Sequence, residues 1–322
     1  MTSIRCSHIM TSRNIFLRVQ RHNLAPSLFN QNLFSAKTLH VKAVSLVPVK
    51  LAYASYESMQ ETGGALKHPI IIMHGLFGSK NNWNSLCKAI HQQTKRKVIA
   101  VDARNHGDSP HSTKMTYKHM AEDIVQLMND LGFEKSILIG HSMGGSTMMY
   151  MALHYPKLVE KLIVVDMSPV KASPILLEMI NIFHAMRSVR LTGFTTLSKA
   201  RKMVDEQLSY TVKSQALRQF LLMNLVEADA GRYKWRVNLP VLEQNFPTQI
   251  AVFPNIGSAT FAGPTLFIGG AKSDFIRVED HSKIKELFPT AKFQYIADAN
   301  HWVHADKPAE FLKITNDFIN QS

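Results

Sequence analysis

Short apolar runs that alternate with amphipathic helical segments are the feature that most constrains how this 322-residue chain can fold. Alternation of this kind predicts an α/β fold, in which helices cover both faces of a mostly parallel central sheet. Nearly continuous apolar strands agree, because both faces of such a sheet are buried. The runs that we interpret as buried strands are residues 68–75, 97–107, 136–142, 161–169, 264–270 and 291–297, preceded by one or two strands within residues 47–57.

The alternation stops between about residues 170 and 262, where the pattern predicts helices. Because this segment interrupts the strands, we expect a helical cap that is inserted after the sixth strand and lies over the strand ends. In its first helix, Ile175, Met179, Phe183 and Met186 recur at helical spacing. Such a stripe is typical of a packed core, and it would equally suit the lining of a substrate pocket.

The first 45 residues differ in composition from the rest of the chain. They contain no acidic residue, and residues 13–21 place three arginines beside apolar residues in a basic amphipathic pattern. This composition is typical of a mitochondrial transit peptide, with a disordered basic tail as the alternative. We therefore expect a transit peptide at about residues 1–45, a folded domain at residues 46–322 and a location in the mitochondrial matrix.

The net charge of +13 overstates how basic the folded part is. Seven Lys and Arg residues precede the first acid, Glu57, and without them 30 basic residues face 24 acidic ones. No Lys or Arg cluster alternates with aromatic residues as a nucleic-acid surface requires, so we expect no nucleic-acid partner.

The cysteines and the hydropathy exclude two further classes of protein. Cys6 and Cys87 are the only cysteines, which excludes a disulfide framework and suits a reducing compartment. No apolar run reaches the roughly 18 residues that a transmembrane helix needs, so none is expected. Peripheral contact with a membrane remains compatible with this sequence.

Residues 140–144, GHSMG, match the pattern G-x-S-x-G between a predicted strand and a predicted helix. Glycine two positions before and two after the serine allows a turn so sharp that side chains there would collide with backbone. The hydroxyl then lies at a helix N-terminus, where free amides favour developing negative charge. We identify Ser142 as a candidate nucleophile, and the alternative is a glycine-rich turn with an incidental serine.

A histidine that could accept the serine proton follows the last predicted strand. The segment ANHWVHADKP contains His301 and His304. We identify His301 as the candidate base and expect a structural role for His304. The pair lacks a third ligand at a recognised spacing, so we expect no metal, and the chemistry needs no cofactor.

The remaining parts of the predicted site are a carboxylate and an oxyanion hole. Asp166 and Asp274 each follow a predicted strand and each preserve the chain order serine, acid, histidine. The position after the penultimate strand, that of Asp274, is the more usual one. The backbone amides of Met143 and of either Leu76 or Phe77 could bind a substrate oxyanion.

Five motifs and a cap segment together resemble the alpha/beta-hydrolase domain-containing protein 11 group and its bacterial esterase relatives. The motifs are HGLFGSKNNW, VDARNHGDSPHS, GHSMGG, VVDMSPV and NHWVHADKP, with KWRVNL in the cap, and the resemblance extends from about residue 48 onward. It implies an alpha/beta-hydrolase fold and a serine ester hydrolase, mitochondrial in animals, acting on acylglycerols such as diacylglycerol. It also shifts the choice of acid to Asp166, with Asp274 as the alternative.

Two details of the resemblance concern loops near the predicted site. Asn300 stands where the family has glycine before the histidine, and asparagine tolerates a left-handed backbone. His106 and Asp108, in RNHGDSP, have no chemical role that the sequence assigns, and we interpret them as residues that shape their loop.

The sequence therefore predicts acyl-ester hydrolysis through an acyl-enzyme. One alternative is a thioesterase or another acyl hydrolase that uses the same triad. The other is a mitochondrial binding or protective protein with little turnover, and protein partners in the matrix are compatible with either function. Haloalkane and epoxide hydrolases need an aspartate at the nucleophile position, so Ser142 argues against them.

Overall fold

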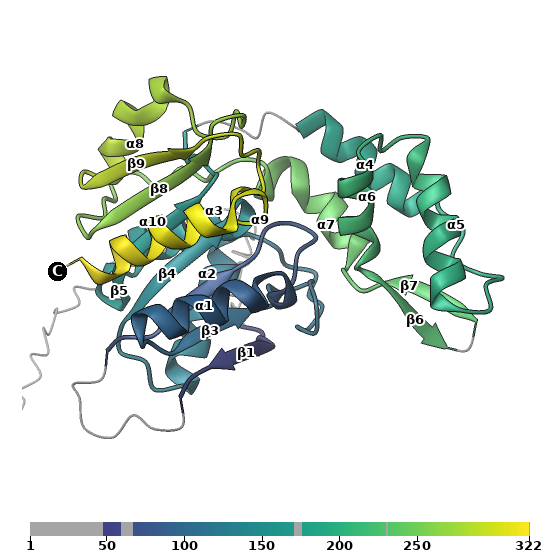
Figure 1. Ribbon diagram of the computed structural model, residues 1–322, viewed down its shortest axis with the longest axis horizontal. Helices are drawn as coiled ribbons and strands as arrows, with labels where there is room; N and C mark the ends of the chain where they lie inside the picture. Colours follow the sequence, from purple (N-terminus) through teal and green to yellow (C-terminus); the bar gives the residue numbers. More distant parts are fainter. Residues whose placement is uncertain (1–47, 59–66, 171–175, 230, 322) are drawn as a thin grey trace, which may run out of the picture. The chain divides into compact units, whose positions relative to one another are not determined.

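A seven-stranded sheet with the strand order β1-β3-β2-β4-β5-β8-β9 organises the fold (Figure 1). The computed structural model describes residues 48–58, 67–170, 176–229 and 231–321. Only β1 is antiparallel, to β3, and the other neighbours run parallel. The strands are β1 (Tyr53–Tyr56), β2 (Ile70–Met73), β3 (Val98–Val101), β4 (Ser136–His141), β5 (Val159–Val165), β8 (Thr265–Gly270) and β9 (Ala291–Ile296).

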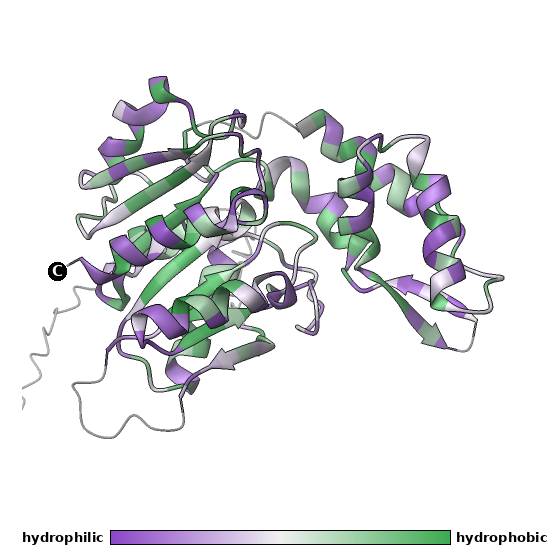
Figure 2. Cartoon of the chain, in the orientation of Figure 1, coloured by the Kyte–Doolittle hydropathy of each residue, from purple (hydrophilic) through white to green (hydrophobic). Residues whose placement is uncertain are grey.

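The central strands are buried on both faces because every second side chain points the same way. Ile71 and Met73 of β2 pack into one hydrophobic cluster, whereas Ile70 and Ile72 pack into another on the opposite face. Figure 2 shows the central strands as predominantly apolar, with polar residues on the outer surfaces of the covering helices. The predicted α/β fold with a mostly parallel sheet is confirmed.

Helices cover the two faces of the sheet. The first cluster includes residues of α2 (Tyr117–Asp130) and α3 (Met143–His154), and the second includes residues of α1 (Asn84–Thr94) and α10 (Pro308–Asn320). Cys87 of α1 is a buried free thiol. Shorter helical elements are η1 (Lys80–Trp83), η2 (Pro156–Leu158), η4 (Val278–Asp280), α8 (His281–Leu287) and α9 (Val303–Asp306).

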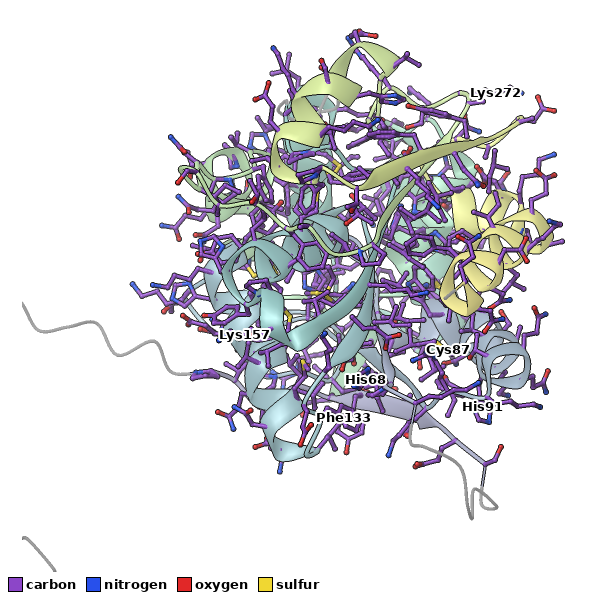
Figure 3. The ribbon with its side chains drawn as sticks, turned by 90° about the vertical axis from the view of Figure 1, so that its left-hand side faces the viewer. His68, Cys87, His91, Phe133, Lys157 and Lys272 are labelled. Atoms are coloured by element: carbon purple, nitrogen blue, oxygen red, sulfur yellow. The ribbon has the colours of Figure 1, made fainter. Side chains whose placement is uncertain are left out.

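The two edges of the parallel sheet differ in chemistry. His68, Phe133 and Lys157, labelled in Figure 3, come just before β2, β4 and β5 and mark the amino-terminal edge. The loops that contain the candidate site residues instead follow β2, β4, β5, β8 and β9, at the carboxyl ends of the strands. Ligands bind at that edge in open α/β sheets.

A separate group of elements lies between β5 and β8, and we call residues 176–229 and 231–250 the cap. Its stripe residue Ile175 lies outside the described residues. The cap comprises α4 (Leu176–Ser188), α5 (Leu197–Ser209), α6 (Gln215–Leu222), the antiparallel pair β6 (Leu225–Asp229) and β7 (Arg232–Trp235), α7 (Leu239–Asn245) and η3 (Phe246–Ile250).

The structure corrects two details of the sequence prediction in this region. The helical pattern around α6 predicts helix as far as residue 229, but α6 ends at Leu222 and the chain forms the strand β6 instead. The reason is the pairing of β6 with β7, whose side chains alternate between buried and exposed: Tyr233 and Trp235 are buried, and Arg232 and Lys234 are exposed. The cap also follows the fifth strand of the described sheet, not the sixth, because only one strand forms before β2 within the described residues.

The predicted transit peptide lies outside the described residues. Among the helices that the structure does describe, none has the length and apolar character needed to cross a bilayer.

Candidate active site

Ser142 occupies the sharp turn between β4 and α3. Its φ of 52° and ψ of −118° lie outside the regions that L-residues ordinarily adopt. A Cβ atom at Gly140 would lie 2.2 Å from the carbonyl oxygen of Gly144, and one at Gly144 would lie 2.4 Å from that of Met73. Both glycines are therefore required by backbone contacts, and the strain at Ser142 is of the kind found at a strand-to-helix nucleophile turn.

The structure brings His301 and Asp166 together. The two atoms His301 Nδ1 and Asp166 Oδ2 lie 2.7 Å apart, although 135 residues separate them along the chain. Asp166 is fully buried directly after β5, with its own left-handed φ of 48°. Asp274, the alternative acid, is exposed. Of the two carboxylates that the sequence left open, Asp166 is the one beside the histidine.

The buried carboxylate of Asp166 has two further donors. The backbone N–H of Gly270 donates to Oδ1 over 3.1 Å, and the hydroxyl of Ser273 donates to Oδ2. These bonds compensate for removing the charge from water. They also fix the carboxylate so that Oδ2 faces His301. The sequence pattern did not indicate Ser273, whose role depends on the path of the loop after β8.

The ring of His301 is held by its neighbours. The Phe275 ring stacks on it with centroids 3.9 Å apart and planes 18° apart, and the Nε2 of His141 donates to the His301 backbone oxygen over 2.8 Å. Because Nδ1 donates to Asp166, Nε2 is the nitrogen that remains to accept a proton. Burial lowers the pKa of His141 well below its ordinary value, so His141 stays neutral.

Ser142 and His301 line the same cavity, whose volume is about 250 Å³. The lining on the sheet side includes the residues of the loop after β2, together with Met143 and Met167. The cap contributes the polar residues Glu178 and Ser214 and otherwise apolar side chains, namely Met179, Ile182, Leu217, Phe220, Phe246 and Ile250. An apolar cavity next to a serine, an imidazole and a carboxylate suits a substrate with an acyl chain.

The sequence left two candidates, the backbone amides of Leu76 and Phe77, for the second donor of the oxyanion hole beside Met143. Met143 is the first residue of α3, so its N–H has no partner within the helix. The N–H of Phe77 donates to His106 Nε2 over 3.2 Å and is therefore occupied. The N–H of Leu76 donates to no other group that the structure describes. The geometry therefore favours Leu76 over Phe77 as the partner of Met143.

His106 and His74 are buried neutral residues that join the loops after β2 and β3. Nδ1 of His106 donates to the Arg104 oxygen over 3.0 Å, which leaves Nε2 as the acceptor for Phe77. Nε2 of His74 likewise accepts from the N–H of Ala103 over 3.0 Å. Burial lowers the pKa of His106 to about 3 and also lowers the pKa of His74.

Three further residues that the sequence analysis singled out, His304, Asp108 and Asn300, lie in the loops near the candidate site. The His304 ring stacks on Trp83 with centroids 4.3 Å apart, and burial lowers the pKa of His304 to about 3. Asp108 forms an ion pair with Lys80, which also pairs with the buried Asp102. Asn300 is not left-handed, whereas Asp298 has a φ of 60°.

Within the described ranges, no group of three or more His, Cys, Asp or Glu side chains could hold a metal ion.

Comparison with known proteins places the chain in a family. The family model described as "alpha/beta hydrolase fold" matches residues 68–308. A mouse protein named "sn-1-specific diacylglycerol lipase ABHD11" is 44% identical over 286 residues, which is 88% of this chain and 90% of the mouse protein. "Esterase YbfF" of Escherichia coli is 32% identical over 252 residues, 78% of this chain and 93% of that protein.

A solved structure shows the same likeness in three dimensions. The structure described as "Marine microorganism esterase" is 36% identical, with a TM-score of 0.74, and the match covers 84% of this chain and 99% of the esterase. The chain therefore belongs to the alpha/beta-hydrolase fold family, and within it to the alpha/beta-hydrolase domain-containing protein 11 group.

Proposed function

We propose that this protein is a serine hydrolase that cleaves carboxylic esters of apolar acyl chains, in acylglycerols such as diacylglycerol. The observation that carries the proposal is the common position of three groups. Ser142 and the pair of His301 and Asp166 lie at one edge of the sheet, beside a cavity that the cap lines with apolar side chains. The names of its relatives, diacylglycerol lipases and esterases, support the substrate class.

In the first half of the proposed reaction, Ser142 Oγ attacks the ester carbonyl carbon while His301 Nε2 takes the hydroxyl proton. The imidazolium that forms is stabilised by the buried carboxylate of Asp166, 2.7 Å from Nδ1. The N–H groups of Met143 and Leu76 bind the oxygen that becomes negative. His301 then gives its proton to the leaving alcohol as the carbon–oxygen bond breaks, and the acyl group remains on Ser142.

In the second half of the reaction, water removes the acyl group from Ser142 with the help of His301 and the same two amides. His301 Nε2 removes a proton from a water molecule whose oxygen attacks the acyl carbon, and the two amides again bind the oxyanion. The ester bond to Ser142 breaks, its oxygen recovers the proton from His301, and the fatty acid leaves. Every proton is carried by His301 and every charge is met by a fixed group.

A fluorophosphonate probe, which labels activated serines, tests the nucleophile. Wild-type protein should be labelled and Ser142→Ala should not. The matched control is Ser146→Ala, one turn further along α3 and outside the cavity lining, which should label like the wild type. Persistent labelling of Ser142→Ala would remove this serine from the proposed mechanism.

We also propose that about residues 1–45 direct the protein into the mitochondrial matrix and are cleaved there, leaving a domain of residues 46–322. The three arginines within residues 13–21 support this, as does the lack of acids before Glu57. A peripheral contact with a membrane would supply the lipid, and matrix proteins are the available partners. A fluorescent protein fused to residues 1–45 should enter mitochondria, and exchange of the arginines at 13, 18 and 21 for glutamate should stop it.

A further inference from the structure

Phe77, next to the proposed oxyanion amide, has a backbone conformation that its residue type disfavours. Its φ is 61° and its side chain is buried. The N–H of Gly78 donates to the Gly75 oxygen over 3.0 Å, which closes a four-residue turn. Leu76 has no positive φ, so the turn is of type II, in which the third residue must be left-handed and is usually glycine or asparagine.

Both backbone polar groups of Phe77 are bound by side chains from other parts of the chain. The N–H donates to His106 Nε2 over 3.2 Å. The carbonyl oxygen accepts from the side-chain amide of Asn224 over 2.7 Å, and Asn224 is 147 residues away. The first partner belongs to the loop after β3, and the second belongs to the cap. Phe77 is therefore the residue at which the cap holds the turn that follows β2.

The backbone of Asn224 is fixed within the cap, between α6 and β6. Its N–H donates to the Leu221 oxygen over 3.0 Å, and its own oxygen accepts from the N–H of Arg236 over 2.7 Å. The residue is buried, with 4% of its surface exposed. Only the side-chain amide extends out of the cap, and it ends on the Phe77 oxygen.

We propose that Asn224 is a positioning residue for ester hydrolysis, which keeps the Leu76 N–H directed at the oxyanion by holding Phe77 in its left-handed conformation. This inference rests on the proposed function. Asn224 is not among the residues that line the cavity, and it acts only through the turn.

The geometry of the turn transmits the effect of Asn224 to Leu76. The N–H of Leu76 shares a planar trans peptide with the Gly75 oxygen, so the two groups point in opposite directions. The Gly75 oxygen accepts from both His74 Nδ1, over 2.7 Å, and Gly78 N–H. While the backbone of Leu76 keeps its conformation, the second bond requires a left-handed Phe77, because a right-handed third residue closes this turn only if the peptide between Leu76 and Phe77 flips to give type I. If Phe77 became right-handed, either the turn would open or this peptide would flip and take the Phe77 N–H away from His106. Both changes remove a bond that holds the turn around the Leu76 N–H.

Burial makes the Asn224 amide hard to replace. The Phe77 carbonyl lies beneath the cap, where an unpaired oxygen is costly. Asn224→Ala removes the donor, and Asn224→Asp keeps the shape but places oxygen against oxygen. In both variants the turn loses the bond that favours the strained φ, so the population with a correctly directed Leu76 N–H falls.

The test compares turnover with binding in purified full-length variants that hydrolyse a diacylglycerol. In Asn224→Ala and Asn224→Asp we expect kcat to fall by about 10- to 100-fold, as for partial loss of one oxyanion donor, with KM within about threefold of wild type. A trifluoromethyl ketone analogue of the acyl chain, which forms an oxyanion on Ser142, should bind more weakly by a similar factor.

Asn238→Ala is the matched control. Asn238 is also a cap asparagine, and its side-chain amide donates to Asn105 Oδ1, in the loop after β3, over 3.0 Å. Among the described residues it forms no hydrogen bond with Phe77. We expect its kcat to stay within about threefold of wild type. Equal losses of kcat in the Asn238 and Asn224 variants, or a wild-type kcat in folded Asn224→Ala, would overturn the inference.

A double-mutant cycle separates positioning from general stability, including the case in which the single variants fold poorly. Glycine adopts a left-handed φ without penalty, so in a Phe77→Gly background the further change Asn224→Ala should lower kcat several-fold less than it does in the wild type. The same fold-loss in both backgrounds contradicts the proposal. Failure of the proposed function looks different, because wild-type protein would then show no hydrolysis, or Ser142→Ala would hydrolyse equally well.

Discussion

The carboxyl-terminal edge of the sheet and the cap line the same cavity by different means. At the edge, reactive groups are fixed by backbone geometry and short buried hydrogen bonds, as at the strained Ser142 and at Asp166 with three donors. Apart from Glu178 and Ser214, the cap contributes apolar side chains from α4, α6 and η3, whose contacts are not directional. Changes at the edge should therefore alter turnover, whereas changes in the cap should alter which substrate is accepted.

Asn224, like Asn238, is a polar exception that connects the two regions. It is a polar cap residue with one directional bond to the edge, at Phe77. The experiments proposed for it ask whether the cap also contributes to turnover. If the division between edge and cap holds, changes at the edge should cause the largest losses of activity and changes in the cap the smallest.

The two candidate acids provide the strongest test of the edge. Asp166→Asn should lower kcat by roughly 10⁴-fold, because the amide no longer stabilises the imidazolium and favours the wrong tautomer. Asp274→Asn, at an exposed position, should stay within about threefold of wild type. Both should be measured against a panel of acylglycerols and acyl thioesters, which also defines the substrate class. A large loss in Asp274→Asn alone would reverse the assignment of the acid.

The turn around Ser142 gives the next largest effect. In Gly144→Ala the new Cβ would lie 2.4 Å from the Met73 backbone oxygen, so the turn that presents Ser142, the proposed nucleophile, must move. A displacement of about 1 Å can cost about 100-fold in rate, and we expect a loss of kcat of that order. The neighbouring Gly145→Ala meets its nearest atom, the Gly140 oxygen, only at 3.0 Å. It should lose less, and an equal loss would show that the steric explanation is wrong.

The buried histidines of the edge predict how stability depends on pH. Burial lowers the pKa of His106 and of His304 to about 3 in the folded protein, below the ordinary value of about 6.5 in the unfolded chain. The folded state therefore binds fewer protons, and its stability is complete above about pH 6.5 and falls as the pH drops towards 3. Between pH 6.5 and pH 5, each of these two histidines can lower the free energy of unfolding by up to about 2 kcal/mol.

Urea unfolding at several pH values measures this dependence. His304→Gln should lower the slope of the unfolding free energy against pH by up to about one proton. A pH dependence of unfolding that is identical in His304→Gln and the wild type would contradict the assignment of a buried neutral imidazole.

The smallest expected effect is a change in acyl-chain selectivity, caused by a substitution in the cap. Leu217 lines the cavity from α6 and is half-buried. In Leu217→Trp the larger indole side chain occupies part of the cavity, so kcat/KM should fall by about 10-fold for long acyl chains and change little for short ones. Met203→Trp, at an exposed position of α5 outside the cavity, is the control. An equal loss for long and short chains would contradict the proposed role of the cap.

Much of the framework follows from local patterns in the sequence. Parallel strands were recognisable because both of their faces are buried, as in residues 70–73 of β2. The two glycines around Ser142 were recognisable because a sharp turn excludes a Cβ atom. The hairpin β6–β7 was not predicted, because the short segment 225–229 continues a helical pattern that only its pairing with β7 overrides.

The contacts between distant segments were left open by the same reasoning. Asp166 and Asp274 follow adjacent strands and both fit the chain order, so only the path of the loop after β8 distinguishes them. Leu76 and Phe77 are neighbours in one loop, and only the bond from Phe77 to His106 shows which amide is free.

The sequence alone determined the class of fold, the turn that presents Ser142 and the histidine after the last strand, because these depend on the period of burial and on local sterics. The tertiary structure decided which carboxylate meets His301, which amide can face an oxyanion and how Asn224 reaches Phe77. Hydrogen bonds depend on distances of a few tenths of an ångström between distant segments. Such distances are set by packing and leave no periodic trace along the chain.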